Sequence, residues 1–224
     1  MEMKDVMEII FNIFYLIVIW YLAIKMYKNI DSLNSKDRKT GKLLALAFLL
    51  LALGDTGHVG FRVLAYLKGG LTQNAYLLGM GKMFTSITVT IFYMLLVEVW
   101  RARFDKKHNI VTIVLLLCGI ARLIILFLPG NQWGSQIAPM NFEMYRNIPL
   151  MILGLGVAIL IFKDSKDSRD NTFKWFSIMI FISYAFYIPV ILFARYNPII
   201  GLLMIPKTVA YLAAAFIGYN GIFK

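Results

Sequence analysis

Long runs of apolar residues, separated by short polar stretches, form the main pattern of the sequence. Each of seven runs is about as long as the roughly 20 mostly apolar residues that a helix needs to cross a bilayer. None of them alternates between apolar and polar positions as a half-buried strand does. The pattern predicts one all-α domain over residues 1–224, a polytopic seven-transmembrane-helix bundle. The predicted spans are residues 6–26, 43–67, 76–100, 109–129, 145–163, 173–194 and 198–222.

The composition favours the same class of protein. Hydrophobic residues make up 60% of the 224 residues and charged residues only 16%, whereas soluble domains have about 45–50% apolar and about 25% charged residues. A water-soluble single domain is therefore excluded. The single cysteine, Cys118, excludes a disulfide framework and a cysteine-based zinc site. With only two histidines as well, we expect no metal site and no cofactor.

Lysine and arginine are unevenly divided between the predicted loops. Fifteen of the 23 basic residues lie after the first, third and fifth spans or at the C-terminus, and three lie at the N-terminus or in the other loops. Cytoplasmic loops carry the excess of basic residues, so we expect the N-terminus outside and the C-terminus in the cytoplasm. The same rule accounts for most of the net charge of +11 without a nucleic-acid partner. The expected partners are membrane lipids.

Five basic residues remain, and each falls within or at the edge of a predicted span. Ionisable side chains at membrane depth are costly and usually face a bundle interior or a wet cavity, where they serve function. At a rise of about 1.5 Å per residue, all five map to the outer half of the bundle. The only deep acidic residue that we identify is Asp55. The five basic residues are Arg62, Lys82, Arg122, Arg146 and Lys207.

Three polar side chains share one face of the second predicted span. Asp55, His58 and Arg62 are spaced i, i+3 and i+7, which places them on the same side of a helix. We expect Asp55 to accept a hydrogen bond from His58 or from a basic residue on a facing helix. The alternative is a buried network that only fixes helix packing. Glycines in the same span permit close approach of a neighbouring helix, and they are Gly54, Gly57 and Gly60.

Further polar side chains map to the same depth. Lys82 in the third span is followed one turn later by hydroxyls, including Ser86, in a stripe suited to lining a cavity. Tyr187 and Tyr211 supply hydroxyls in the sixth and seventh spans, and Tyr211 lies one turn after Lys207. Proline removes a helical donor and tends to kink a helix, so three prolines at similar depth could splay the outer helix ends. They are Pro149, Pro189 and Pro206.

A surplus of positive charge in a low-dielectric region has to be relieved. Peripheral arginines can extend to the surface, a lysine can lose its proton, or an anion can bind. We favour the third, so the predicted function is a receptor-like or transporter-like protein that binds an anionic small molecule or lipid headgroup in an outward-facing pocket. The candidate ligand-binding residues are Asp55, His58, Arg62, Lys82, Ser86, Arg122, Arg146, Tyr187, Lys207 and Tyr211.

The alternative is a metal-independent intramembrane enzyme that acts on a lipid. Asp55 would orient His58 as a general acid/base, and the basic residues would stabilise developing negative charge. Zinc hydrolases of the ceramidase and adiponectin-receptor type are disfavoured because only one histidine lies within a span. A retinal protein with Lys207 in the seventh span is disfavoured because the third span offers Lys82, where microbial rhodopsins have carboxylates.

Five segments resemble those of a family of small bacterial seven-helix membrane proteins with no known activity. The resemblance covers essentially the whole chain and implies a bacterial cytoplasmic membrane protein. It implies no ligand, reaction or catalytic residue. The segments are Gly54-Asp55-x-x-His58-x-x-x-Arg62, Gly81-Lys82-x-x-Thr85-Ser86-Ile87-Thr88, Tyr145-Arg146-Asn147-Ile148-Pro149, Tyr187-Ile188-Pro189-Val190 and Ile205-Pro206-Lys207-Thr208.

Overall fold

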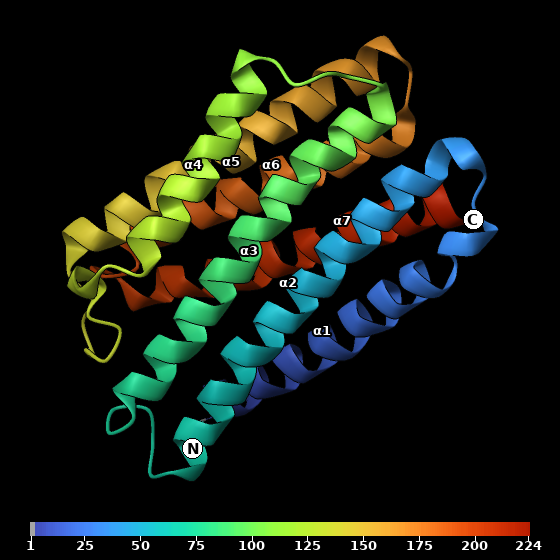
Figure 1. Cartoon of the computed structure of the whole chain (residues 1–224). Coiled ribbons are helices and arrows are strands. Elements are labelled where there is room, and N and C mark those ends of the chain that lie inside the picture. Colours follow the sequence, from blue (N-terminus) through green and yellow to red (C-terminus); the bar gives the residue numbers. More distant parts are fainter. Residues whose placement is uncertain (1–2) are drawn as a thin grey trace.

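The structure is a computed structural model that describes residues 3–224, and within these residues all regular secondary structure is helical, without a strand. Seven α-helices form one elongated bundle (Figure 1). Three short 3-10 helices, Ile30–Ser32, Pro129–Asn131 and Pro198–Leu203, lie in the connections. The α-helices are α1 (Met3–Lys28), α2 (Ser35–Leu67), α3 (Ala75–Phe104), α4 (Ile110–Leu126), α5 (Met140–Asp167), α6 (Asn171–Phe193) and α7 (Met204–Phe223).

Helices long and apolar enough to cross a membrane confirm the predicted helical membrane bundle. Six of the seven meet both criteria in the described residues, whereas α4 has only 17 residues. The predicted fourth span, residues 109–129, is longer than α4 because the helix ends before Pro129. Proline disfavours helical geometry in the residue before it, and Leu128 is extended, with φ −70° and ψ 137°. The protein is therefore a multi-pass membrane protein with one short apolar helix.

Several helices extend beyond their apolar runs. The second helix begins at Ser35 rather than at residue 43, because Asn34 caps it by accepting a hydrogen bond of 2.8 Å from the backbone N–H of Asp37. The fifth helix runs from Met140 to Asp167, past both ends of the predicted span 145–163. The polar residues next to these apolar runs, which the hydropathy pattern predicts as loops, thus continue the helices.

Two of the three prolines lie in helix interiors, as expected, and the third lies in the first turn of its helix. Pro149 is inside α5 and Pro189 is inside α6. The predicted span 198–222 instead divides into the 3-10 helix Pro198–Leu203 and α7. Pro206 is the third residue of α7, where a backbone N–H has no helical acceptor in any case. The expectation that Pro206 kinks its helix is therefore wrong.

The two ends of the bundle differ in their connections (Figure 1). The end named here the Lys224 end carries the C-terminus and the α1–α2, α3–α4 and α5–α6 connections. The opposite end, named the Trp133 end, carries the α2–α3, α4–α5 and α6–α7 connections. Every candidate binding residue lies on a helical segment that approaches the Trp133 end. Toward the Lys224 end the core is aromatic and tightly packed, with Phe48 rings 5.5 Å from Phe92 and 6.3 Å from Phe176.

Glycines allow α2 and α3 to pack closely, as the sequence predicts, but only at two of the three positions. A Cβ at Gly54 would lie 1.8 Å from Thr88 Oγ1, and one at Gly57 would lie 2.3 Å from the Phe84 ring. At Gly60 a Cβ would meet no atom within 4 Å. Gly54 and Gly57 therefore lie in the close contact and Gly60 does not, although the contact continues where Gly81 of α3 lies against His58 and Phe61.

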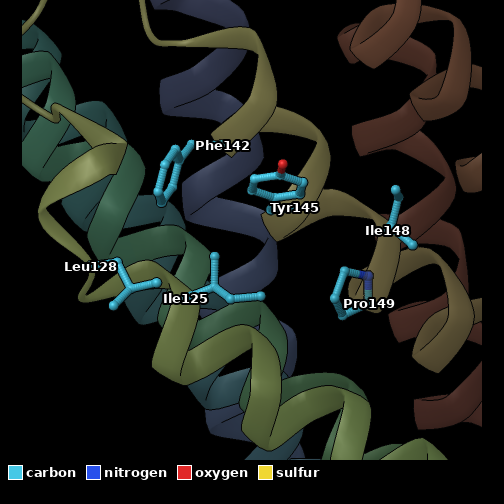
Figure 2. A pocket seen from close by; sticks show the side chains of 6 residues that line it. All are labelled: Ile125, Leu128, Phe142, Tyr145, Ile148 and Pro149. Carbon is cyan, nitrogen blue, oxygen red and sulfur yellow. The ribbon is translucent and has the colours of Figure 1, made fainter.

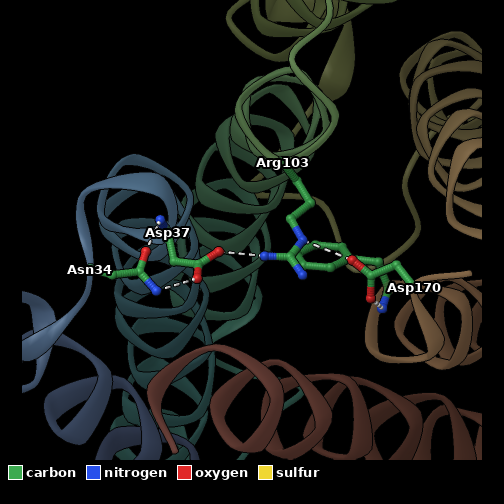
Figure 3. Close-up of polar contacts among 5 residues, drawn as sticks. Asn34, Asp37, Arg103 and Asp170 are labelled. Atoms are coloured by element: carbon green, nitrogen blue, oxygen red, sulfur yellow. Dashed lines mark hydrogen bonds and ion pairs between the residues drawn. The ribbon is translucent and has the colours of Figure 1, made fainter. Parts of the chain in front are cut away.

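An arginine joins three helices at the Lys224 end, in an arrangement named here the Arg103 latch (Figure 3). The Arg103 guanidinium on α3 donates to Asp37 near the start of α2 and, through Nε at 2.7 Å, to Asp170. Asp170 also caps α6 by accepting from the Phe173 backbone N–H at 3.1 Å. Asn34 Nδ2 donates to the second Asp37 oxygen at 2.9 Å. The latch therefore fixes the ends of α2, α3 and α6 relative to each other.

We predict that Arg103→Met lowers the free energy of unfolding by about 1–2 kcal/mol. The value is modest because the three charged side chains retain 11–23% exposure, so water partly replaces the lost ion pairs. Thermal unfolding of the purified protein in detergent measures it. Lys166→Met, an exposed position on α5, is the matched control. Equal unfolding midpoints for both variants would contradict a stabilising role of the latch.

Candidate functional site

Asp55 is the centre of a polar cluster that joins four helices. Its two carboxylate oxygens accept hydrogen bonds from the Tyr15 hydroxyl on α1, at 2.6 Å, and from the Thr85 hydroxyl on α3, at 3.2 Å. Lys207 on α7 attracts the carboxylate electrostatically. Gly54 makes the α3 contact possible, since any side chain there would displace Thr88, one turn from Thr85. The charges of the acid on α2 and the base on α7 thus partly compensate each other.

Lys207 lies between two tyrosine rings. Its Nζ is 4.8 Å from the centroid of the Tyr187 ring on α6 and 5.1 Å from that of Tyr211, one turn further along α7. The negative faces of aromatic rings attract an ammonium group. This arrangement brings together three of the sequence-predicted site residues.

The tyrosine hydroxyls make bonds of their own. Tyr211 Oη lies 2.5 Å from Tyr93 Oη, with either able to donate. The Tyr187 hydroxyl donates to Asn147 Oδ1 on α5 at 3.0 Å, and the Tyr184 hydroxyl donates to the Leu150 carbonyl at 2.9 Å. These bonds connect α3, α5, α6 and α7 around Lys207 and hold its two tyrosines in place.

His58 does not pair with Asp55. Its Nδ1 is buried and has no hydrogen-bond partner among the described residues, whereas Asp55 is bonded to Tyr15 and Thr85. Lys207 and two other basic residues, Arg62 and Lys82, act on His58 electrostatically. The geometry therefore lacks the Asp55–His58 contact that the acid/base alternative requires.

Lys82 is exposed and lies among charged side chains from two other helices. It interacts electrostatically with Arg62 on α2 and with Glu143 and Arg146 on α5. Because Lys82 also acts on His58, it links the α5 side chains to the α2 face. The sequence did not single out Glu143, since it lies just before the predicted fifth span.

Arg122 is a structural anchor in this arrangement. The side chain is 2% exposed and belongs to α4. Its Nε donates to the Arg146 carbonyl at 2.7 Å, and its Nη1 donates to the Ser86 carbonyl at 2.8 Å and to the Thr90 hydroxyl. Pro149, which has no N–H, leaves the α5 backbone near Arg146 short of donors. Ser86 therefore holds α4 through its backbone carbonyl. The sequence pattern instead predicts a role for its hydroxyl in lining a cavity.

Arg146 ties the α4–α5 connection to the bundle. It donates to Asn131 Oδ1 at 3.2 Å and to Glu143 at 3.3 Å, and its guanidinium lies 4.7 Å from the centroid of the Trp133 ring. Asn131 is fully buried and donates to carbonyls at the end of α4, including Ile125 at 2.6 Å. The connection therefore caps the end of α4, and Arg146 holds the connection in place through Asn131 and Trp133.

The structure thus sorts the ten candidate residues into two groups. The first group, named here the basic cluster, is connected by direct or electrostatic interactions with Lys207 or His58, and the second group anchors α4 and its connection. Tyr15 and Asn147 also contact these residues, but no spacing in the sequence relates them to α2 or α6. The basic cluster consists of Asp55, His58, Arg62, Lys82, Tyr187, Lys207 and Tyr211. The anchoring group consists of Ser86, Arg122 and Arg146.

Two apolar pockets have no charged side chain in their lining. One, of about 380 Å³, lies between the end of α4 and the start of α5 (Figure 2). The other, of about 330 Å³, lies between α2 and α3 and is lined by Gly57, Phe61, Met80, Met83, Phe84 and Ile87. The described residues contain no group of three or more His, Cys, Asp or Glu side chains that could hold a metal ion.

No known protein family, curated protein or solved structure matches the chain.

Proposed function

We propose that this protein lies in the cytoplasmic membrane of a bacterium and binds an anionic group in the outer half of its bundle, as a receptor or transporter. The distribution of basic loop residues supports an outer N-terminus and a cytoplasmic C-terminus. The Trp133 end is then the outer end, and all seven helices cross the membrane. The anion is a carboxylate, a phosphate or the headgroup of an anionic lipid.

The observation that carries this proposal is the charge imbalance around Lys207. Without counting Arg62, this part of the described residues contains four basic side chains and two carboxylates. The hydrogen-bond partners of Arg122 are all neutral, so they do not compensate its charge. Positive charge away from water is costly unless an anion compensates it. The basic side chains are Lys82, Arg122, Arg146 and Lys207, and the carboxylates are Asp55 and Glu143.

Lys207 is the expected contact for the anion. An ammonium group has three donors, and within the described residues no hydrogen bond from Lys207 Nζ is formed, since its close neighbours are the faces of Tyr187 and Tyr211. A bound anion would receive these donors. Lys82 is exposed nearby and offers a second positive charge on the approach.

We predict that Lys207→Met weakens sulfate binding by about tenfold or more, because a charge-assisted hydrogen bond to the anion is lost. Equilibrium binding of labelled sulfate to the purified protein in detergent measures it. Arg195→Met, an exposed site in the α6–α7 connection, should bind as the wild type does. Because Lys207→Met leaves Asp55 without its base, the double variant Asp55→Asn, Lys207→Met tests binding with both charges removed.

Two further measurements separate the sources of the anion. Competition by phosphatidylglycerol vesicles, but not by phosphatidylcholine vesicles, would identify a lipid headgroup as the ligand. Uptake of sulfate into proteoliposomes would favour a transporter, and binding without uptake would favour a receptor. A wild-type protein that binds neither sulfate nor phosphatidylglycerol would overturn the proposal.

A further inference from the structure

We infer that Asp55 takes up a proton when an anion binds at Lys207, so that the ligand is accommodated together with one proton. This inference rests on the proposed function and names the second species bound at the same site. It makes the basic cluster a proton-coupled site, and in a transporter the coupled process would be symport of the anion with a proton.

The first step is the pairing of Asp55 with Lys207. The carboxylate and the ammonium attract each other across α2 and α7, and together they carry no net charge. Tyr15 and Thr85 hold one carboxylate oxygen each, so the carboxylate is held in one position. The charges of Asp55 and Lys207 therefore balance each other, and the excess positive charge comes from the other basic side chains.

The second step is the effect of an anion on this balance. An anion that binds the Lys207 ammonium shares it with the Asp55 carboxylate, and the two negative charges then repel each other in a medium of low dielectric constant. A proton from the outer aqueous phase that binds to Asp55 removes one of these charges. No other bond is formed or broken, and the complex of Lys207, the anion and Asp55 carries one negative charge fewer than it would without the proton.

The third step is the ability of the cluster to hold the proton. A protonated carboxyl group needs an acceptor for its hydrogen, and the Tyr15 oxygen, 2.6 Å from Asp55 Oδ2, can accept as well as donate. Thr85 can continue to donate to the other oxygen, Oδ1. The hydrogen-bond partners observed around Asp55 therefore suit both of its protonation states.

Other titratable groups around Asp55 have to be considered as proton acceptors. Tyr15 comes from α1, His58 and Arg62 from α2, and Lys207 and Tyr211 from α7. From α3 the facing group is Thr85, which does not titrate. His58 is the main competitor, because its Nδ1 has no hydrogen-bond partner among the described residues. However, three basic residues act on His58, and their positive charge opposes a further one.

Calorimetry with sulfate tests the inference, because sulfate does not itself titrate near neutral pH. Titrations in two buffers of different ionisation enthalpy give the number of protons taken up, which should be about one per sulfate in the wild type. Asp55→Asn, which keeps the size of the side chain and an acceptor oxygen, should bind sulfate with uptake near zero. His58→Gln, which removes the competing proton acceptor, should still take up about one proton for each sulfate that it binds.

Infrared difference spectra of the wild type provide a readout that does not depend on folding of a variant. Sulfate binding should produce the C=O band of a protonated carboxylic acid. Sulfate binding without proton uptake, uptake that persists in Asp55→Asn, or uptake that is lost in His58→Gln would each overturn the inference while leaving the anion site standing. Absence of sulfate binding in the wild type would instead remove the free-anion form of the proposed function.

Discussion

Arg122→Met should lower the free energy of unfolding by about 3–5 kcal/mol, because three hydrogen bonds to a buried charged group are lost together. The guanidinium of Arg122 joins α4 to α3 through Ser86 and Thr90, and to α5 through the Arg146 carbonyl. Without it, these acceptors lose a donor in a region away from water. Thermal or denaturant unfolding in detergent, followed by circular dichroism, measures the effect.

A lysine at the same position separates charge from geometry. Arg122→Lys keeps the positive charge, but an ammonium cannot reproduce the planar fork that reaches both neighbouring helices. We expect a stability between those of the wild type and Arg122→Met, and no effect of Arg195→Met at an exposed site. If Arg122→Met kept its unfolding midpoint but lost sulfate binding, Arg122 would be a ligand contact rather than an anchor.

Gly54→Val should destabilise the protein by about 3 kcal/mol, because it overpacks a contact between two helix backbones. The first added carbon would lie 1.8 Å from Thr88 Oγ1, 2.9 Å from Thr88 Cβ and 3.4 Å from Thr85 Cα. The third helix would have to move away from α2, and Thr85 would move with it, away from Asp55. Unfolding in detergent measures the loss of stability.

The matched control is Gly60→Val in the same helix. An added Cβ there meets no atom within 4 Å, and the intrinsic helix preference changes equally in the two variants. Gly60→Val should therefore unfold close to the wild-type midpoint. Equal destabilisation of the two variants would show that loss of glycine itself, and not the contact with α3, determines the effect.

The hydrophobic pattern was sufficient to predict the helices but not all of their ends. Apolar runs report the part of a helix that avoids water, so polar ends such as the Ser35 start of α2 are missed. That start depends on capping by Asn34, a local hydrogen bond that hydropathy does not detect. Pro129 limits α4 because proline restricts the residue before it, and the predicted seventh span begins as the 3-10 helix Pro198–Leu203 rather than as part of α7.

The candidate site was predictable where its residues share one helix. Helical spacing correctly relates Lys207 to Tyr211, whose ring lies 5.1 Å from the ammonium. It cannot predict which residue of another helix completes a contact, because that depends on how the helices are rotated and on which are neighbours. Asp55 therefore has Tyr15 as its partner instead of His58. Likewise, burial of Arg122 was predictable, but its use in binding backbone carbonyls was not.

The short α4 has a consequence for the bilayer around it. Its 17 residues span about 25 Å, against about 30 Å for a typical hydrocarbon core, and it ends beside the apolar pocket that it shares with α5. Exposed Phe127 and Leu128 extend the apolar surface only slightly. In the proposed topology α4 crosses the membrane, and this difference in length is a hydrophobic mismatch that the surrounding lipids have to relieve. One side of the bundle would then thin the membrane locally and favour lipids with shorter chains.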